Sequence, residues 1–196
     1  MRVLVACECS GAVRDAFLAR GHEAVSCDLI PSEQPGPHIL GDALERLDDG
    51  WDMLIAFPPC TYLAGSGLHW NGRIPGRREK TEAALEFVRR LLNAPVNRIA
   101  LENPVGCIGT RIRRPDQTIQ PYEYGHDASK RTCLWLKNLP RLKPTMYVKP
   151  RIVDGRPRWS NQTDSGQNIL TPSETRAADR AKTYAGIAKA MAEQWG

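Results

Sequence analysis

The chain has 196 residues, of which 41% are hydrophobic and 25% charged, and its formal net charge at pH 7 is +5. This length suits a single domain spanning 1–196 and excludes two full domains; the sequence contains neither an apolar run long enough to cross a bilayer nor a cleavable signal pattern. We therefore expect a soluble, cytoplasmic protein without a membrane partner, whose positive charge favours polyanions such as nucleic acid or nucleotide phosphates.

The six cysteines do not have the pattern of a disulfide scaffold or of a metal site. Most of them lie far apart in the sequence, which favours reduced thiols. Cys7 and Cys9 form the closest pair, but no Cys-x-x-Cys or His-x-x-x-His set accompanies them, and structural zinc sites need four ligands at recognisable spacings. The sequence therefore predicts no metal.

Two strands and a helix are predicted at the start of the chain. Residues 2–6 form an apolar, β-branched run, a turn of small residues follows at Ser10-Gly11, and the next residues show the spacing of a short helix. Residues 22–27 predict the second strand, which ends at Asp28.

The third strand, predicted at 53–57, ends in Pro58-Pro59-Cys60. Before it, we expect a proline-rich loop and a short helix at 43–47. Two prolines remove two amide donors and cannot continue a central strand, so the Cys60 thiol is expected on a stiff turn at the end of the strand. This position suits a nucleophile, although on geometry alone a structural thiol remains the alternative.

A glycine-rich loop, a helix and a strand come next. Residues 64–80 predict a mobile loop that could close over a substrate. The apolar spacing of residues 80–92 predicts an amphipathic helix, and residues 97–101 predict a strand that is followed by Glu102 and Asn103.

The last part of the chain combines a further strand, a basic insert and a helix. The strand is predicted at 132–136. Residues 137–172 are rich in proline and basic residues with weak periodicity, which predicts a short, irregular insert whose cations could follow phosphates. An alanine-rich helix is expected from about 173 to 195, with a cap at 171–174.

Strands that alternate with helices predict an α/β fold with a doubly wound, mostly parallel sheet. In such a sheet, ligands bind beyond the carboxyl ends of the strands. A glycine-containing turn followed by an acid after the second strand could hold a cofactor through its ribose, but the three-glycine dinucleotide fingerprint is missing, which disfavours nicotinamide cofactors. For Asp28, an ordinary loop acid is the alternative. The groups expected to meet at the edge formed by the carboxyl ends of the strands are Ser10, Gly11, Asp28, Asp42, Cys60 and Glu102.

The order of these motifs resembles the cytosine-carbon-5 methyltransferase family, which uses S-adenosylmethionine. The resemblance covers roughly 2–136 and resumes at 182–188, which is similar to the family's last cofactor-side motif. It implies the Rossmann-like fold of class I S-adenosylmethionine-dependent methyltransferases and a DNA partner. The motifs that carry it are Ser10-Gly11, Asp28, Gly41-Asp42, Pro58-Pro59-Cys60, Glu102-Asn103-Pro104 and Ser129-Lys130-Arg131.

The family's mechanism assigns roles to these residues. A cysteine thiolate adds to carbon 6 of the pyrimidine ring, and carbon 5 then takes a methyl group from S-adenosylmethionine. By resemblance, Cys60 is the nucleophile, Glu102 is the acid at ring nitrogen 3, and Arg131 bonds the exocyclic oxygen or a phosphate. The implied substrate-binding residues are Pro58, Pro59, Asn103 and Lys130. The implied cofactor-binding residues are Cys9, Ser10, Gly11, Asp28, Asp42, Pro58 and Tyr184.

The chain also departs from the family's pattern. Cys133 stands where a second arginine is expected, and only 137–172 are available where sequence-reading members carry a long target-recognition region. This favours a compact DNA methyltransferase of the kind that phages and prophages carry. The same chemistry on a free pyrimidine nucleotide, such as dCMP or dUMP, is an alternative. A non-catalytic nucleic-acid-binding protein is a weaker one, because a binding module needs neither Cys60 nor Glu102.

Overall fold

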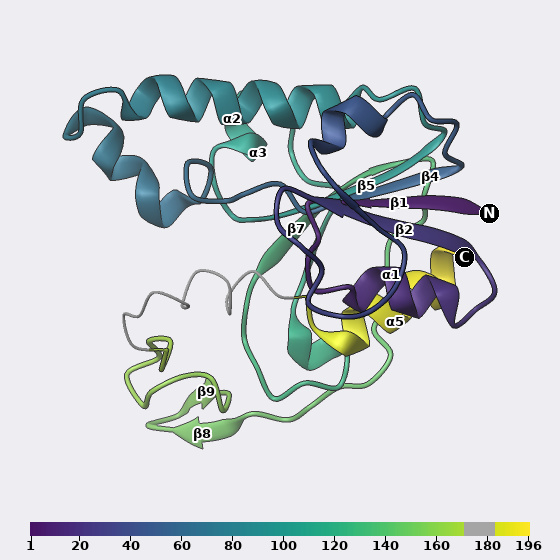
Figure 1. Ribbon diagram of the computed structural model, residues 1–196. Coiled ribbons are helices and arrows are strands. Elements are labelled where there is room, and N and C mark those ends of the chain that lie inside the picture. Colours follow the sequence, from purple (N-terminus) through teal and green to yellow (C-terminus); the bar gives the residue numbers. More distant parts are fainter. Residues whose placement is uncertain (171–182) are drawn as a thin grey trace.

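A seven-stranded sheet forms the centre of the computed structural model, which describes residues 1–170 and 183–196 (Figure 1). The strands are β1 (Arg2–Ala6), β2 (Glu23–Asp28), β3 (His38–Leu40), β4 (Met53–Ala56), β5 (Arg98–Pro104), β6 (Gln117–Ile119) and β7 (Thr132–Lys137). They lie in the order β3-β2-β1-β4-β5-β7-β6. The first five are parallel, whereas β7 is antiparallel to both of its neighbours. Because the order reverses between β1 and β4, the sheet is doubly wound and mostly parallel, as the sequence predicts.

Helical segments cover both faces of this sheet. They are α1 (Ala12–Leu18), η1 (Ala43–Arg46), η2 (Gly65–Gly72), α2 (Arg77–Leu92), α3 (Ile108–Arg111), η3 (Pro121–Glu123) and α5 (Ala185–Trp195), where η marks a 3-10 helix. Helices α1 and α5 lie together on one face, and α2 and α3 lie over the other (Figure 1).

The alternation of side chains along β1 explains the two layers, since successive residues of a strand point to opposite faces. Val3 and Val5 belong to the core beneath α1 and α5, whereas Leu4 and Ala6 belong to the core beneath α2. All four are fully buried. The central strand therefore faces apolar side chains on both sides, as parallel strands in such sheets do.

Some elements differ from the sequence-based expectation. The sequence does not predict β3 or β6, because three residues are too few to show a period, and both strands depend on pairing with longer neighbours. Residues 64–80 are not an irregular loop, since they contain η2 and the first turn of α2. Residues 43–46 form a 3-10 helix, and α2 begins at Arg77 instead of residue 80.

The basic insert contains a small hairpin that extends away from the main sheet (Figure 1). Its strands are β8 (Arg151–Val153) and β9 (Arg156–Arg158). The hairpin turns at Asp154 and Gly155, whose φ angles are +50° and +72°, and Asp-Gly is a favoured pair for such a two-residue turn. The insert is thus only partly irregular.

The final helix begins at Ala185, and Tyr184 precedes it with an extended backbone. The cap predicted at 171–174, the first part of the predicted helix and Lys182 lie outside the described residues. Among the helices of the described residues, none is both long and apolar enough to cross a membrane.

Candidate functional site

The carboxyl ends of β1, β2 and β4 bring several predicted site residues to one edge of the sheet. The order of strands reverses here, which is where doubly wound sheets bind their ligands. The pKa of Cys7, which lies just after β1, shows that acidic side chains from the neighbouring strands lie close to it. Burial raises the pKa of its thiol to about 12, and the negative charges of Asp28 and Asp42 add to that effect. Asp28, the last residue of β2, and Asp42, which follows β3, therefore lie around the turn that follows β1.

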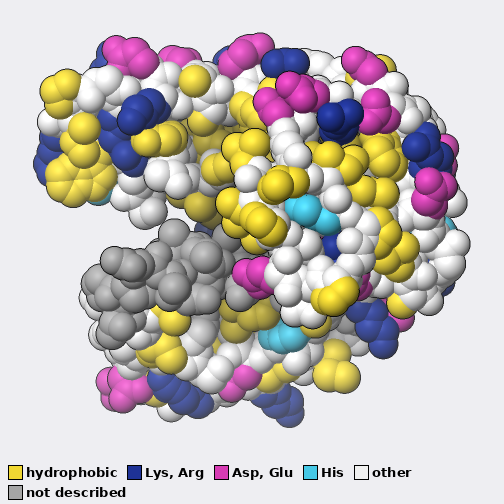
Figure 2. Space-filling model, viewed as in Figure 1, with side chains coloured by type: hydrophobic (Ala, Val, Ile, Leu, Met, Phe, Trp, Pro, Cys, Tyr) yellow, Lys and Arg dark blue, Asp and Glu magenta, His cyan; other side chains and the backbone are white. Residues whose placement is uncertain are grey.

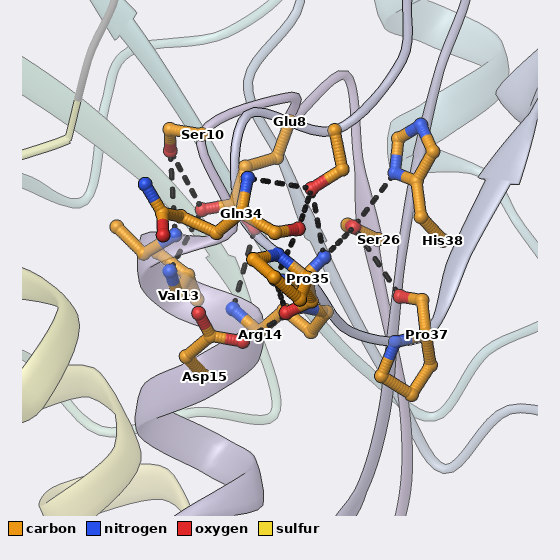
Figure 3. Close-up of polar contacts among 12 residues, drawn as sticks. Glu8, Ser10, Val13, Arg14, Asp15, Ser26, Gln34, Pro35, Pro37 and His38 are labelled. Carbon is orange, nitrogen blue, oxygen red and sulfur yellow. Dashed lines mark hydrogen bonds and ion pairs between the residues drawn. The ribbon is translucent and has the colours of Figure 1, made fainter.

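This turn is organised by Glu8, which the sequence analysis did not identify as a site residue. Its buried carboxylate accepts hydrogen bonds from the backbone N–H groups of Val13, at 2.7 Å, and Arg14, at 3.3 Å (Figure 3). Ser10 donates its hydroxyl to the same carboxylate at 3.3 Å. Glu8 thereby satisfies open donors at the start of α1, although burial still raises its pKa.

Arg14 is a fully buried guanidinium that ties α1 to the loop between β2 and β3. It donates to the hydroxyls of Ser26, at 3.2 Å, and Ser32, at 3.0 Å, and to the carbonyl oxygens of Gln34 and Pro35 (Figure 3). Its Nε also forms an ion pair with Asp15 at 2.7 Å. No sequence pattern indicates this role, because the partners are small hydroxyls and loop carbonyls up to 21 residues away.

Gly11 is explained by this arrangement. Its φ of +74° lies in the left-handed region, and a Cβ there would collide with the Arg14 guanidinium. The requirement for glycine therefore comes from the turn and from Arg14. Cys9 lies in the same turn, where its carbonyl oxygen accepts the backbone N–H of Glu33 at 2.7 Å.

Asp28 and Asp42 both bond to nearby backbone groups. The Asp28 carboxylate accepts the N–H of Ile30 at 3.3 Å, and that of Asp42 accepts the N–H of Leu44 at 2.9 Å, which caps η1. Next to Asp28, Leu29 and Ile30 are 75% and 54% exposed. The edge of β2 thus offers an acid beside an uncovered apolar surface.

The Pro-Pro-Cys turn is fastened to the end of β5. Asn103, which is buried, donates its side-chain amide to the carbonyl oxygen of Pro58 at 2.7 Å. Cys60 follows the exposed Pro59 and has an exposed thiol, while its carbonyl oxygen accepts the N–H groups of Leu63 and Ala64. The turn is therefore held from inside while the thiol faces outward.

A second set of contacts joins the loops that follow β4 and β5. The N–H of Cys107 donates to Leu63 O and that of Gly65 to Val105 O, both at 2.9 Å. Between them, Gly106 lies so close to the Leu63 carbonyl that a Cβ would collide with it. The two loops therefore form one unit.

Glu102 lies at the end of β5 in a partly buried position. Burial raises the pKa of its carboxyl group, while the positive charge of Lys130 and a hydrogen bond from Thr132 act in the opposite direction. A carboxyl group in such surroundings keeps its proton to higher pH than an exposed one and can donate a hydrogen bond.

Lys130 connects the end of β5 with the start of α5. Its Nζ lies 5.9 Å from the centroid of the Tyr184 ring, and Tyr184 packs against His126 at 5.1 Å between ring centroids. The Nε2 of His126 accepts the N–H of Gly186 at 2.8 Å, and burial lowers the pKa of this histidine. Tyr184 is thereby brought near the Glu102 edge.

Arg131 is exposed and forms no hydrogen bond or ion pair with any described residue. Its charge is felt at Tyr122, on the side of the insert. Arg131 and Glu102 both affect the pKa of the Cys133 thiol, but the described residues include no hydrogen bond or ion pair from Arg131 to Glu102 or Cys60.

The insert is fastened to the loop that carries Lys130 and Arg131. Asn161 forms two hydrogen bonds with the backbone of Ser129, both at 2.9 Å. Trp159 stacks on Tyr122 with 4.2 Å between ring centroids. The described residues contain no cluster of histidine, cysteine or acidic side chains that could hold a metal ion.

No model of a known protein family matches this chain, and no curated protein is similar to it. Among solved structures, the chain is similar to an E. coli protein described as a candidate DNA modification methyltransferase encoded within a prophage. The two share 15% sequence identity with a TM-score of 0.50, and the match covers 79% of this chain and 56% of the other. This chain therefore spans little more than half the length of that protein. The similarity shows a Rossmann-like methyltransferase fold.

Proposed function

We propose that this protein is an S-adenosylmethionine-dependent methyltransferase that acts on carbon 5 of cytosine in DNA through a covalent adduct of Cys60. One observation carries the proposal. The exposed thiol of Cys60 lies on the loop after β4, and Glu102, whose pKa is raised by burial, lies at the end of β5. The Asn103 hydrogen bond and the contacts around Gly106 join these two segments into one unit. The description of the structural neighbour as a candidate DNA modification methyltransferase gives independent support.

The residues at the edge of β1 and β2 suit a nucleoside cofactor. Asp28 provides a carboxylate for ribose hydroxyls, and the exposed side chains of Leu29 and Ile30 provide an apolar surface for a flat base. Ser10, Cys9, Gly11, Asp42, Pro58 and Tyr184 complete the proposed cofactor edge. S-adenosylmethionine supplies an electrophilic methyl group on a sulfonium sulfur.

The Cys60 thiolate starts the reaction by forming a bond to carbon 6 of the cytosine ring. The added electron pair makes carbon 5 nucleophilic, and the methyl group is then transferred to it. Loss of the carbon-5 proton to a base allows the bond between sulfur and carbon 6 to break, which restores the aromatic ring and the free thiolate. Pro58 and Pro59 keep the thiol on a stiff turn during these steps.

Glu102 stabilises the charge that the addition creates. Its carboxyl donates a proton to ring nitrogen 3 as the thiolate adds, and recovers it when the thiolate leaves. Burial raises the pKa of this group, so it keeps its proton to higher pH than an exposed carboxyl group does. Arg131 remains free to bond a phosphate or the exocyclic oxygen, and Lys130 adds positive charge on the substrate side. Asn103 supports the substrate site from inside through its hydrogen bond to Pro58.

The insert favours DNA over a free nucleotide. Two arginines of the insert already have partners within it: Arg151 forms an ion pair with the Asp164 carboxylate, and Arg158 donates a hydrogen bond to the Asp164 carbonyl oxygen. Other basic side chains of the insert are exposed and have no ion-pair partner among the described residues, which leaves them available for phosphates. These are Arg141, Lys143, Lys149 and Arg156. A compact enzyme of this kind fits a phage or prophage gene product that acts in the host cytoplasm.

The test is transfer of labelled methyl from S-adenosylmethionine to duplex DNA, single-stranded DNA, dCMP and dUMP, offered separately. We expect label at carbon 5 of cytosine in DNA and none with Cys60→Ala, while this variant still binds S-adenosylmethionine. Label only in a mononucleotide would replace DNA by the free nucleotide as substrate. Binding of DNA without any transfer would leave a non-catalytic nucleic-acid-binding protein.

A further inference from the structure

The segment after Cys60 carries an exposed aromatic group that the hydrophobic core does not use. Trp70, in η2, is 43% exposed, and the His69 ring packs on it with 4.7 Å between centroids. The Arg73 guanidinium lies 5.6 Å from the centroid of the same ring. A partly exposed flat ring with a cation over it resembles the surfaces on which nucleic-acid bases stack.

This segment is held firmly to the start of α2. Arg77 donates to the carbonyl oxygen of Thr61 at 3.0 Å and lies over the Tyr62 ring at 4.9 Å. Thr81 donates its hydroxyl to the carbonyl oxygen of Tyr62 at 3.2 Å and accepts the side-chain amide of Asn71 at 3.0 Å. These contacts hold the segment that carries Trp70 against residues 61 and 62, beside the loop that carries the proposed nucleophile.

The charge of the segment is strongly positive. Its basic side chains adjoin exposed hydrophobic ones on the projecting lobe formed by η2 and the start of α2 (Figure 2). Ile74, which is 46% exposed, adds to the apolar part. The cations from residue 73 onward are Arg73, Arg77, Arg78 and Lys80, against the single acid Glu79.

We propose that residues 69–80 form a grip for a single DNA strand. The Trp70 ring stacks on an unpaired base close to the target cytosine, and Arg73 and Arg78 contact the phosphates beside it. The proposal rests on the proposed function, which places DNA at Cys60. Stacking of this kind contributes about 1–3 kcal/mol per base and tolerates any sequence, because every base has a π-face.

A strand with unpaired bases suits Trp70 better than an intact duplex. Bases within a duplex are covered on both faces by their neighbours, whereas extrusion of a target base leaves the adjoining bases uncovered on one side. The partly exposed Trp70 ring can then replace the lost stacking partner. A protein partner is disfavoured by the positive charge, which matches a phosphate backbone.

The first test measures the affinity of the full chain for a fluorescent single-stranded oligothymidylate with one central cytosine, without methyl donor. We expect Trp70→Ala to weaken binding by about 5- to 150-fold and Trp70→Phe to retain most of the affinity. Arg73→Ala should lower the salt dependence by about one phosphate contact, a slope change of roughly 0.7. Arg20→Ala, which removes an exposed arginine at the far end of α1, is the matched control and should leave both quantities unchanged.

The second test locates the stacked base by placing abasic sites at each position around the cytosine. At the stacked position, the abasic site should weaken binding by the wild type and have no further effect on Trp70→Ala. Equal losses for both proteins at every position would overturn the stacking role, as would an unchanged affinity of Trp70→Ala.

The outcomes separate this proposal from the proposed chemistry. DNA binding that depends on Trp70 without any methyl transfer would keep the grip and overturn the catalytic role of Cys60. Methyl transfer to DNA with an unchanged affinity of Trp70→Ala would keep the chemistry and overturn the grip. Methyl transfer to mononucleotides by a chain that does not bind DNA would overturn the grip and the DNA substrate together.

Discussion

Glu102 keeps its proton to higher pH than an exposed carboxyl because burial raises its pKa, and the opposing effects of Lys130 and Thr132 are smaller. The same burial has a cost for folding. In the unfolded chain the carboxyl ionises near its usual pKa of 4.5, so the contribution of Glu102 to stability is fully present below that pH and is lost as the pH rises through the raised pKa. Once it ionises, the buried carboxylate of the proposed acid destabilises the folded state.

Glu102→Gln should separate the role of Glu102 as a proton donor from the effect of its ionisation on stability. Glutamine can donate a hydrogen bond but cannot transfer a proton, so we expect kcat to fall by about 100-fold or more and the alkaline limb of the pH profile that belongs to Glu102 to vanish. The variant should gain Tm relative to the wild type at alkaline pH and not below pH 4.5. Full activity with an unchanged pH profile would remove Glu102 from the proposed mechanism.

Gly106 tests whether the loops after β4 and β5 must stay joined. In Gly106→Ala the new Cβ meets the Leu63 carbonyl, which should separate the loops, reduce kcat, and lower the free energy of unfolding by about 1–3 kcal/mol. Gly109→Ala is the matched control, because its Cβ would make only an ordinary contact, 3.7 Å from Pro115. Urea denaturation and methyl transfer compare the two variants, and equal behaviour would contradict the role given to Gly106.

At the scale of elements, α1 and the loop between β2 and β3 depend on Arg14. This loop begins directly after Asp28 and lies against the turn that carries Cys9, and both residues belong to the proposed cofactor edge. The conformation of the loop therefore matters for cofactor binding. This coupling arises from one buried side chain that bonds to both a helix residue and loop carbonyls.

Arg14→Met should remove this coupling while filling part of the space. Hydrogen bonds to charged groups contribute about 1.5–3 kcal/mol each, so we expect the free energy of unfolding to fall by about 3 kcal/mol and the affinity for S-adenosylmethionine to weaken. Urea denaturation and calorimetric titration measure the two effects. Arg20→Ala, on the same chain segment but exposed, should change neither; a loss of similar size there would show that the effect is not specific to Arg14.

At the scale of the whole molecule, the insert acts on the proposed site through Asn161, which holds Ser129 next to Lys130. Asn161→Ala should therefore reduce kcat on DNA by misplacing Lys130 and Arg131. Lys149→Ala removes an exposed charge from the same insert without touching this contact, and should raise KM for DNA with little change in kcat. The same KM effect in both variants would mean that the insert binds DNA without positioning the site.

Much of the architecture follows from local sequence. The apolar runs of β1, β2, β4, β5 and β7 and their polar ends are visible without a structure, since buried strands need β-branched residues and the fold aligns their carboxyl ends. The contacts that hold the site are not visible in this way. Arg14 and Glu8 act through backbone groups, Gly106 acts through its lack of a side chain, and Asn161 lies 32 residues from its partner.

The exposure of Cys60 allows the proposed active sites in a sample to be counted. Of the six cysteines it alone is exposed, and burial raises the pKa of each of the other five, so these are less ionised and less reactive at neutral pH. A mild alkylating reagent should therefore attach once per folded chain, at Cys60, and mass spectrometry would give the stoichiometry. The titrated fraction would report how much of any preparation is competent, and a substrate bound at the site should slow the labelling.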